Sequence, residues 1–284
     1  MLNLHPMMDP ARSKDFWLLI LATNSNPNGD PQDDGKPRNL DDTDHGWVSG
    51  VSVKRKGRDF AQLFHEQLLA VPQGGIKSEI RGKSADMESY VATHWDARLF
   101  GGVPLKLKGD RTLGHAPITI SAMNESLTPV EIYDFPITCA AGEKADEKDG
   151  EAGEGLRANM GEVSVVRHGL YLVQGTYTAA RGIRNGVSPD DLRILFDSLF
   201  ACWDHSQSAA RPHVTLHAAF VATHSGVRRN ENTTVARRRV QVSHPDEAHS
   251  IDDYTIKFDT EGSPQMDFHI FDDTTNGFNP AETV

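Results

Sequence analysis

Three short runs of lysine and arginine carry the charge that could bind a polyanion. They are Lys54, Arg55, Lys56 and Arg58, then Arg228 and Arg229, then Arg237, Arg238 and Arg239. Ammonium and guanidinium groups donate hydrogen bonds to phosphate oxygens, so such runs suit contact with a nucleic-acid backbone. A run of like charges also occurs on an ordinary solvated face, and the third run could equally be an edge strand whose charges deter sheet-to-sheet pairing. The residue types alone leave these interpretations open.

A polar loop with asparagine at alternate positions precedes the first basic run. Asn24, Asn26 and Asn28, followed by a Gly-Asp pair, imitate the start of a calcium-binding EF-hand loop. The twelfth position is Gly35, where that loop needs a bidentate glutamate, and a strand pattern comes before it. We therefore predict no calcium site. Asparagine side chains in turns cap backbone groups, and beside a basic run they are also candidates for contact with a polyanion, so both roles stay open.

Histidine and cysteine offer little metal chemistry. His213 and His217 would share one face of a strand, as metal ligands can, but no clear third ligand accompanies them. A structural or RNA-adjacent role is the better interpretation. Cys139 and Cys202 lie far apart without a CxxC pair, which excludes a thiolate zinc site and argues against a disulfide scaffold. We expect neither a metal nor another cofactor.

The charge of the chain is unevenly distributed. Its 284 residues include 29 basic and 40 acidic side chains, for a net charge of -11. Residues 244–284 account for -9 and residues 141–155 for -4, which leaves the remainder at +2 and keeps a polyanion partner open. No apolar run is long enough to cross a bilayer, and the N-terminus lacks the layout of a secretion signal, so we expect a cytoplasmic protein.

The elements that position these residues follow from the hydrophobic pattern. Residues 16–22 form a continuous apolar run that predicts a central strand, and residues 24–46 read as a long loop. Residues 53–71 predict an amphipathic helix with the first basic run in its first turn. Its apolar stripe is expected at Phe60, Leu63, Phe64, Leu68 and Val71.

The second half of the chain alternates strands and helices. We predict a helix over 86–100 that stops at Gly101, strands over 117–123, 132–140, 163–177 and 213–222, and a helix that begins at a Ser188 cap. Gly169 and Gly175 are expected to bend the long strand over 163–177. The alternating runs 254–258 and 266–270 predict an extra hairpin. The acidic segment 141–155 is expected to be a mobile surface loop, because it has no aromatic or β-branched residue.

The element order predicts the fold class. Without the loops it reads strand, helix, strand, strand, helix, strand, which is the βαββαβ order of an α+β ferredoxin-like, RNA-recognition-like palm with large inserted loops. We expect a single domain over residues 1–271 and a disordered acidic tail over 272–284. This sheet serves many unrelated functions, so the fold alone does not choose one.

Several motifs together resemble one known family. NSNPNGDP from Asn24, Pro37-Arg38 and VSVKRKGRDF from Val51 are similar in order and spacing to the opening signature of the backbone subunits of type I Cascade. The likeness is greatest for types I-C and I-B, within the CRISPR-associated RAMP superfamily. It continues through DARLFGG from Asp96, HAPITISAMNESLTPV from His115, HGLYLVQGTYTA from His168, SPDDLRILFDSLF from Ser188 and SAAR from Ser208. The motifs keep the family's order over about 190 residues.

The resemblance implies a non-catalytic RNA-binding subunit with a palm and an inserted thumb. Many copies would oligomerise in a helical filament along one CRISPR RNA, in an antiviral surveillance complex. The implied partners are CRISPR RNA, target DNA through guide pairing, further copies of the chain and other Cascade subunits, with no membrane. A subunit that accepts any guide must contact phosphates rather than base edges. The lack of an aromatic RNA-stacking motif is consistent with bases left free for pairing.

The matching positions supply the expected RNA-binding residues, and no catalytic residue is expected. They are Asn24, Asn26, Asn28, Arg38, Lys54, Arg55, Lys56, Arg58, Arg98, Arg181, Arg184, Arg211 and His213. A cationic helix start beside a polar loop is better explained by phosphate contact than by a solvated face.

Two alternatives remain. Backbone subunits of the related type III complexes cleave bound RNA with a loop aspartate, and Asp30, Asp33 and Asp34 lie in a loop near a basic run. Aspartates in a loop rich in Asn, Gly and Pro are also ordinary turn formers. The chain could instead be a self-assembling structural protein without nucleic acid, in which the acidic tail of one copy meets the basic run of the next. RNA that co-purifies with the protein and a guide-programmed cleavage assay separate these functions.

Overall fold

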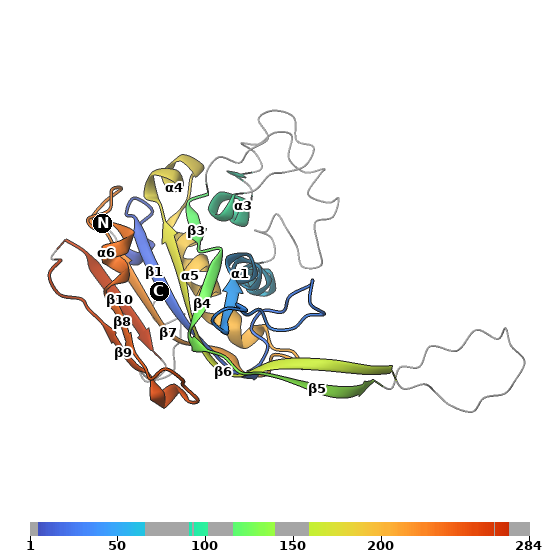
Figure 1. Cartoon of the computed structure of the whole chain (residues 1–284). Coiled ribbons are helices and arrows are strands. Elements are labelled where there is room, and N and C mark those ends of the chain that lie inside the picture. The colour runs from blue at the N-terminus through green and yellow to red at the C-terminus, as the bar shows by residue number, and fades with distance from the viewer. Residues whose placement is uncertain are drawn as a thin grey trace, which may run out of the picture.

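Figure 1 shows the computed structural model of the chain, with one large antiparallel sheet and helices packed on it. The structure describes residues 5–65, 91–92, 94–101, 116–139, 159–263 and 265–272. The predicted acidic loop 141–155 and the predicted tail 272–284, except Asp272 itself, lie outside these ranges. The mixed α+β class is confirmed.

The elements have the following bounds. The main sheet contains β1 (Lys14–Ser25), β2 (His45–Ser49), β3 (Ile118–Ile120), β4 (Met123–Pro129), β5 (Ile132–Cys139), β6 (Asn159–Tyr177), β7 (Val214–Thr223) and β10 (Asp267–Asp272). A separate pair consists of β8 (Val240–Ser243) and β9 (Thr255–Phe258). The helices are α1 (Gly50–His65), α3 (Trp95–Phe100), α4 (Ala179–Asn185), α5 (Pro189–His205) and α6 (Thr233–Arg237), with single 3-10 turns at Pro6–Met8 and Ile251–Asp253.

Strand β1 lies in the middle of the sheet. The strand order is β10-β7-β1-β6-β4-β2, and β3 and β5 both pair with β6. Leu19 faces Leu172 of β6 on one side and Ala218 of β7 on the other. The side chains of β1 are buried over most of its length, because both faces of the sheet are covered. The prediction of a central strand buried on both faces is confirmed.

Strands β5 and β6 form an arm that projects from the body of the molecule (Figure 1). The pairing runs without a break from Ile132 opposite Val166 to Cys139 opposite Asn159. Beyond this arm, β6 continues through the main sheet beside β1. One strand therefore connects the arm rigidly to the core.

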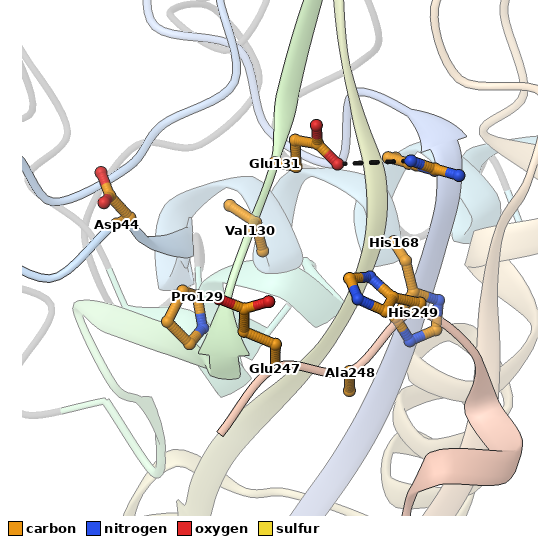
Figure 2. Close-up of a pocket in the computed structure, with 9 residues that line it drawn as sticks. Asp44, Pro129, Val130, Glu131, His168, Glu247, Ala248 and His249 are labelled. Carbon is orange, nitrogen blue, oxygen red and sulfur yellow. Dashed lines mark hydrogen bonds and ion pairs between the residues drawn. The ribbon is translucent and has the colours of Figure 1, made fainter. Parts of the chain in front are cut away.

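One face of the sheet is covered by the β8–β9 pair and the segment between them. Phe220 of β7 stacks on Phe258 of β9, with ring centroids 4.9 Å apart. Leu19 packs in a cluster with Ala248 and Tyr254 from the connecting segment. At one end of this face the connecting segment leaves a cavity beside His168 (Figure 2).

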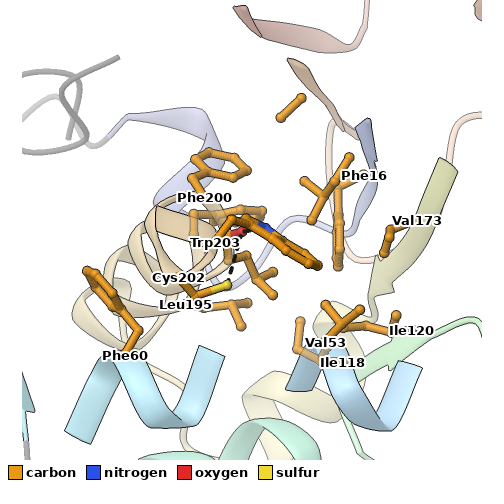
Figure 3. Close-up of a cluster of buried hydrophobic side chains, with 14 of the residues drawn as sticks. Phe16, Val53, Phe60, Ile118, Ile120, Val173, Leu195, Phe200, Cys202 and Trp203 are labelled. Carbon is orange, nitrogen blue, oxygen red and sulfur yellow. Dashed lines mark hydrogen bonds between the residues drawn. The ribbon is translucent and has the colours of Figure 1, made fainter. Parts of the chain in front are cut away.

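Helices α1 and α5 cover the other face and form the main core. Figure 3 shows Phe16 of β1 near Leu195 and Trp203 of α5 in this cluster. Each such fully buried side chain stabilises the fold by roughly 2 kcal/mol. Helix α5 begins at a capping box, in which Ser188 Oγ accepts a hydrogen bond from the Asp191 amide at 3.1 Å and the Asp191 carboxylate accepts one from the Ser188 amide at 2.9 Å. The predicted cap at Ser188 is confirmed.

Helix α1 differs from its prediction at its start and in its buried face. It begins at Gly50 rather than Val53, so the basic run lies one turn inside the helix. Leu63 and Phe64 of the predicted stripe are 62% and 56% exposed. The buried face is set by packing on α5, where a Cβ at Gly57 would lie 3.8 Å from Leu199, at an ordinary contact distance. Residues 66–71, which carry the rest of the predicted stripe, lie outside the described residues.

Two further expectations for the local structure are wrong. The runs 254–258 and 266–270 do not pair with each other, because β9 pairs with β8 and β10 joins the edge of the main sheet beside β7. Residues 237–239 are not an edge strand but the end of α6 and a turn. The bends at Gly169 and Gly175 stay a prediction, and β6 is continuous through both positions. A Cβ at Gly175 would lie 2.1 Å from the Phe16 ring, so close packing explains this glycine.

The stop predicted for the helix over 86–100 is confirmed. Helix α3 ends at Phe100, and Gly101 follows with φ +63°. An L side chain rarely adopts that backbone conformation, so glycine suits the position. Residues 86–90 lie outside the described residues.

Candidate nucleic-acid interface

The polar loop after β1 is bonded to the turn before β7. The Asn26 amide donates to the Ala210 carbonyl at 2.7 Å, and the His213 amide donates to Ser25 Oγ at 2.9 Å. The Thr23 amide adds a hydrogen bond to the His213 carbonyl at 3.0 Å. These bonds place the sequence segments around residues 26 and 211 side by side.

The predicted asparagines differ in what they contact. Asn26 is buried, and its Nδ2 donates to the Gly35 carbonyl at 2.7 Å. Asn28 Oδ1 accepts a hydrogen bond from the Ser49 amide at 2.8 Å, just before α1 begins. Asn24 is exposed and has φ +46°. The backbone-capping interpretation therefore describes Asn26 and Asn28, while Asn24 presents its side chain to solvent.

Lys56 and Arg211 place two positive charges together beside this loop. Lys56 is only 5% exposed, its Nζ donates to Ser206 Oγ at 3.2 Å, and it lies 5.6 Å from the centre of the Trp203 ring. Burial, and then the charge of Arg211, lower the pKa of Lys56 to about 8, while Cys202 and Asp59 act weakly in the opposite direction. No ion pair involves Lys56 or Arg211 among the described residues. A nearby anion would compensate both charges.

The other cations of α1 point elsewhere. Lys54 and Arg58 lie over the Phe100 ring, at 5.9 Å and 5.1 Å from its centre. Burial, and then Arg58, lower the pKa of Lys54. Arg58 lies 3.3 Å from the buried Asp96 carboxylate. Arg55 is exposed and pairs with Asp59 at 3.0 Å on the helix surface.

Arg38 is positioned by its own loop. Its guanidinium lies 3.1 Å from an Asp30 carboxylate oxygen and 4.8 Å from the centre of the Trp47 ring. The Arg38 amide donates to the Asn28 carbonyl at 3.2 Å. Arg38 thus belongs to the same folded loop as the asparagines, with part of its charge balanced by Asp30.

The arginines of α3 and α4 form a second group, and α3 contacts α1 through Asp96 and Arg58. Both carboxylate oxygens of Asp191 accept hydrogen bonds from Arg98, at 2.8 Å and 3.1 Å. Arg98 also donates to the carbonyls of residues 91 and 92. Arg181 donates to the Ala116 carbonyl at 3.2 Å, and Arg184 is exposed at the end of α4. The contacts of Arg98 give it a structural role.

The two histidines differ in exposure. His213 is exposed beside Arg211, and His217 is half-buried on β7 with a partner of its own. Within the described ranges, no group of three or more histidine, cysteine or acidic side chains could hold a metal ion. Cys202 is buried, and burial raises the pKa of its thiol to about 12.

The family of the chain follows from a comparison over most of its length. The family model described as CRISPR-associated protein Cas7 matches residues 12–259. The chain belongs to the Cas7 family. The family resemblance found in the sequence motifs is thereby confirmed, and its likeness to types I-C and I-B stays a prediction. No curated protein matches the chain in sequence.

Two solved structures are similar to this Cas7-family chain. One is a chain of a "CRISPR RNA-guided surveillance complex, pre-nicking", with 11% identity, a TM-score of 0.48 and coverage of 74% of this chain and 78% of that chain. The other is a chain of a "CRISPR RNA-guided surveillance complex", with 12% identity, a TM-score of 0.41 and coverage of 74% and 68%. No helix in the described part of the chain is long and apolar enough to cross a membrane.

Three features of this Cas7-family chain were not predicted from its sequence. Asp96 and Asp191, which neutralise Arg58 and Arg98, lie far from them along the chain. Ser206 and Trp203, which contact Lys56, also lie far from it along the chain. On the arm, Tyr133, Phe135 and Ile137 are all more than a third exposed. Only this last feature has a local signal, since alternate residues of a strand share one face.

Proposed function

We propose that this Cas7-family chain is a non-catalytic RNA-binding backbone subunit of a type I Cascade surveillance complex. Copies of the chain assemble along one CRISPR RNA, bind its phosphates and leave guide bases free to pair with target DNA. Its partners are CRISPR RNA, target DNA, other copies of itself and other Cascade subunits. Family membership supports the CRISPR setting. The geometry around Lys56 supports the RNA contact.

The observation that carries the proposal is the pair of positive charges at Lys56 and Arg211. A lysine that is 5% exposed normally has a carboxylate partner, because an unpaired buried charge is costly. Here the largest effect of a neighbouring charge comes from another cation, Arg211, and Asp59 acts only weakly in the opposite direction. A phosphate held between the two groups would accept hydrogen bonds from both and remove their repulsion.

Helix α1 and the loop before it extend this site. Asn28 fixes the loop to the start of α1, and Asn26 fixes it to the turn that carries Arg211. Asn24, Arg38, Arg55 and His213 have at least part of their side chains accessible around this centre. We assign them to the interface with Lys54, while Arg58 and Arg98 position neighbouring elements through Asp96 and Asp191. Contacts from Arg181 and Arg184 stay a prediction.

The strand order supports a ferredoxin-like palm. In that fold the first strand lies between the fourth and the third, and the second lies at the edge beside the third. Strands β1, β3 with β4, β6 and β7 can take these four roles, since their order is β7-β1-β6 followed by β3 or β4. Helices α1 and α5 then occupy the two crossover positions. The projecting β5–β6 arm is the inserted thumb, and we keep residues 1–271 as one domain.

The loop aspartates have structural contacts. Asp30 pairs with Arg38 at 3.1 Å, and its side chain accepts a hydrogen bond from the Gln32 amide at 2.9 Å. Asp33 and Asp34 are exposed, and Asp34 has φ +45°, which suits a turn. These contacts favour turn formation over metal-assisted cleavage.

The test of the proposal measures RNA affinity with a matched control. Arg211→Gln removes one of the two facing charges at a half-buried position, and Arg228→Gln removes one exposed charge elsewhere. By fluorescence anisotropy on a single-stranded RNA short enough to bind only one copy, Arg211→Gln is expected to weaken binding about tenfold and to reduce the salt slope by about 1. Arg228→Gln should change neither quantity. Equal effects of the two variants would show that RNA responds to net charge only and would reject the site.

A further inference from the structure

The cavity beside His168 lies on the sheet face opposite α1 and α5. It has a volume of about 470 Å³ and opens between the end of β4, β6 and the segment before Tyr254. Figure 2 shows His168 and His249 together on one side of it, with Pro129 and Glu247 across from them. The size is typical of a site that encloses a small group or a side chain. Lys56 belongs to the other face of the sheet.

His168 provides an unused hydrogen-bonding atom in the wall of this cavity. The residue is 6% exposed, and its Nε2 has no hydrogen-bond partner in the part of the chain that the structure describes. Burial lowers the pKa of His168, while Asp253 acts in the opposite direction and His249 adds a smaller lowering effect, so the net shift favours the neutral ring. A buried polar atom without a partner costs free energy, which a bound ligand would recover.

The charged groups around His168 favour a cation. Glu131 lies 3.5 Å from Arg167, so these two side chains balance each other. Asp44 and Glu247 are exposed carboxylates that also line the cavity, and no ion pair within the described ranges involves either of them. Pro129, Val130 and Ala248 add an apolar wall. A phosphate would be repelled by the free carboxylates, whereas a cation on an apolar stem suits these carboxylates, the unpaired His168 nitrogen and the apolar wall.

We propose that this cavity binds an arginine side chain of a second copy of the chain. A guanidinium group is planar and has five N–H donors, so it can bond to a carboxylate and to an imidazole nitrogen at once while stacking on a ring. Its methylene stem matches the apolar wall. The inference rests on the assembly of copies in the proposed function, because a filament needs contacts between unlike surfaces of identical chains.

The arginine comes from the other end of the same sheet. His168 pairs with Thr23 at one end of β1, while Lys14 at the other end pairs with Thr223 of β7. Arg228 and Arg238 follow Thr223 in the chain, are exposed and make no ion pair among the described residues. Copies stacked end to end would bring these arginines to the cavity of the next copy.

The first experiment separates assembly from RNA binding. Asp44→Asn with Glu247→Gln removes the free charges of the cavity, and Asp42→Asn with Asp246→Asn is the control, at exposed positions in the same segments that do not line it. Analytical ultracentrifugation counts copies on a long RNA, and anisotropy measures one copy on a short RNA. We expect the cavity variant to lose about tenfold in assembly while its affinity for short RNA stays within about twofold. Assembly like that of the control, or an equal loss on short RNA, would overturn the proposal.

The second experiment identifies the arginine by charge reversal between copies and by the binding of a free arginine analogue. Glu247→Arg should block assembly, and a copy that carries Arg228→Glu or Arg238→Glu should restore it. Normal assembly of a variant with both Arg228→Gln and Arg238→Gln would contradict the proposal. Arginine amide should also shift the ring signals of His168 in the unassembled protein, whereas a response to adenosine alone would make the cavity a nucleobase site. If the parent protein fails to bind RNA but arginine amide still binds here, the proposed function fails and the cavity assignment stands.

Discussion

Two regions of this protein hold arginine and lysine in opposite ways. Around α3 and the start of α5, Arg98 and Arg58 lie against the nearly buried carboxylates of Asp191 and Asp96. Around the middle of α1, the positive charge of Arg211 acts on the buried Lys56 more strongly than the negative charge of Asp59 does. The local sequence does not distinguish the two regions, because in both of them cationic residues lie beside apolar ones.

The difference separates structural cations from ligand-binding cations. A guanidinium that is neutralised inside the fold contributes to stability and has no free charge for RNA. Two cations held together by the fold lower stability unless an anion from outside joins them. Stability and RNA affinity should therefore respond to different residues, and each prediction below tests that separation.

The largest effect is expected in the neutralised region. Asp191→Ala removes the carboxylate that caps α5 and binds Arg98, which leaves Arg98 buried without its partner. The free energy of unfolding should fall by about 4 kcal/mol. Asp190→Ala is the control in the same helical turn, since the Asp190 side chain is 82% exposed, and it should cost no more than about 0.5 kcal/mol. Urea denaturation compares the two, and equal losses would contradict the assignment.

A crossed pair of methionine variants sharpens the comparison. Lys56→Met replaces a buried ammonium by an apolar side chain of similar length, so stability should stay constant or rise by about 1 kcal/mol while RNA affinity falls about tenfold. Arg98→Met leaves Asp191 unpaired, so stability should fall and the RNA affinity of the folded protein should not change. Thermal unfolding and anisotropy on the same samples give both quantities. The separation is lost if the two variants change the same quantity.

The pH dependence of RNA binding tests Lys56 specifically. Its pKa is about 8 in the free protein because of burial, and a bound phosphate would raise it. Affinity is then fully present below that value and lost as the pH rises, by about tenfold between pH 7 and pH 9. Oligoadenylate is the suitable RNA, because adenine does not ionise in this range. Lys56→Arg should bind without this pH dependence, and a parent protein with a flat profile would exclude Lys56 as a ligand.

The smallest effects are expected at the loop aspartates. Asp30→Ala removes a partly exposed ion pair with Arg38 and should lower the free energy of unfolding by about 0.5 kcal/mol. Asp33→Ala and Asp34→Ala should change it less. Guide-loaded complexes of all three variants and of the parent should leave labelled complementary RNA intact in the presence of magnesium or manganese. Regularly spaced products that disappear in one variant would instead identify an RNase.

Local patterns in the sequence predicted the elements that local physics determines. The apolar run before Asn24 predicted β1, the serine-proline start predicted α5, and the polar composition of residues 24–46 predicted a loop, although β1 extends to Ser25 and β2 begins at His45. The family could also be identified from the sequence, because its motifs are short stretches that occur in this chain in the family's order. The sequence did not predict which strands pair with each other. The predicted hairpin near the C-terminus is wrong because β10 pairs with β7, more than 40 residues earlier in the chain.

The sequence by itself determined that this chain has an α+β pattern, a polar loop followed by a cationic helix, and the motifs of a CRISPR-associated family. Only the tertiary structure decided which cations are neutralised, because Asp191 lies 93 residues from Arg98 along the chain. It also decided that Lys56 is buried beside Arg211, and that His168 lines a cavity with Glu247. Charge and type are properties of one residue, whereas burial and charge pairing depend on neighbours that the whole fold brings together.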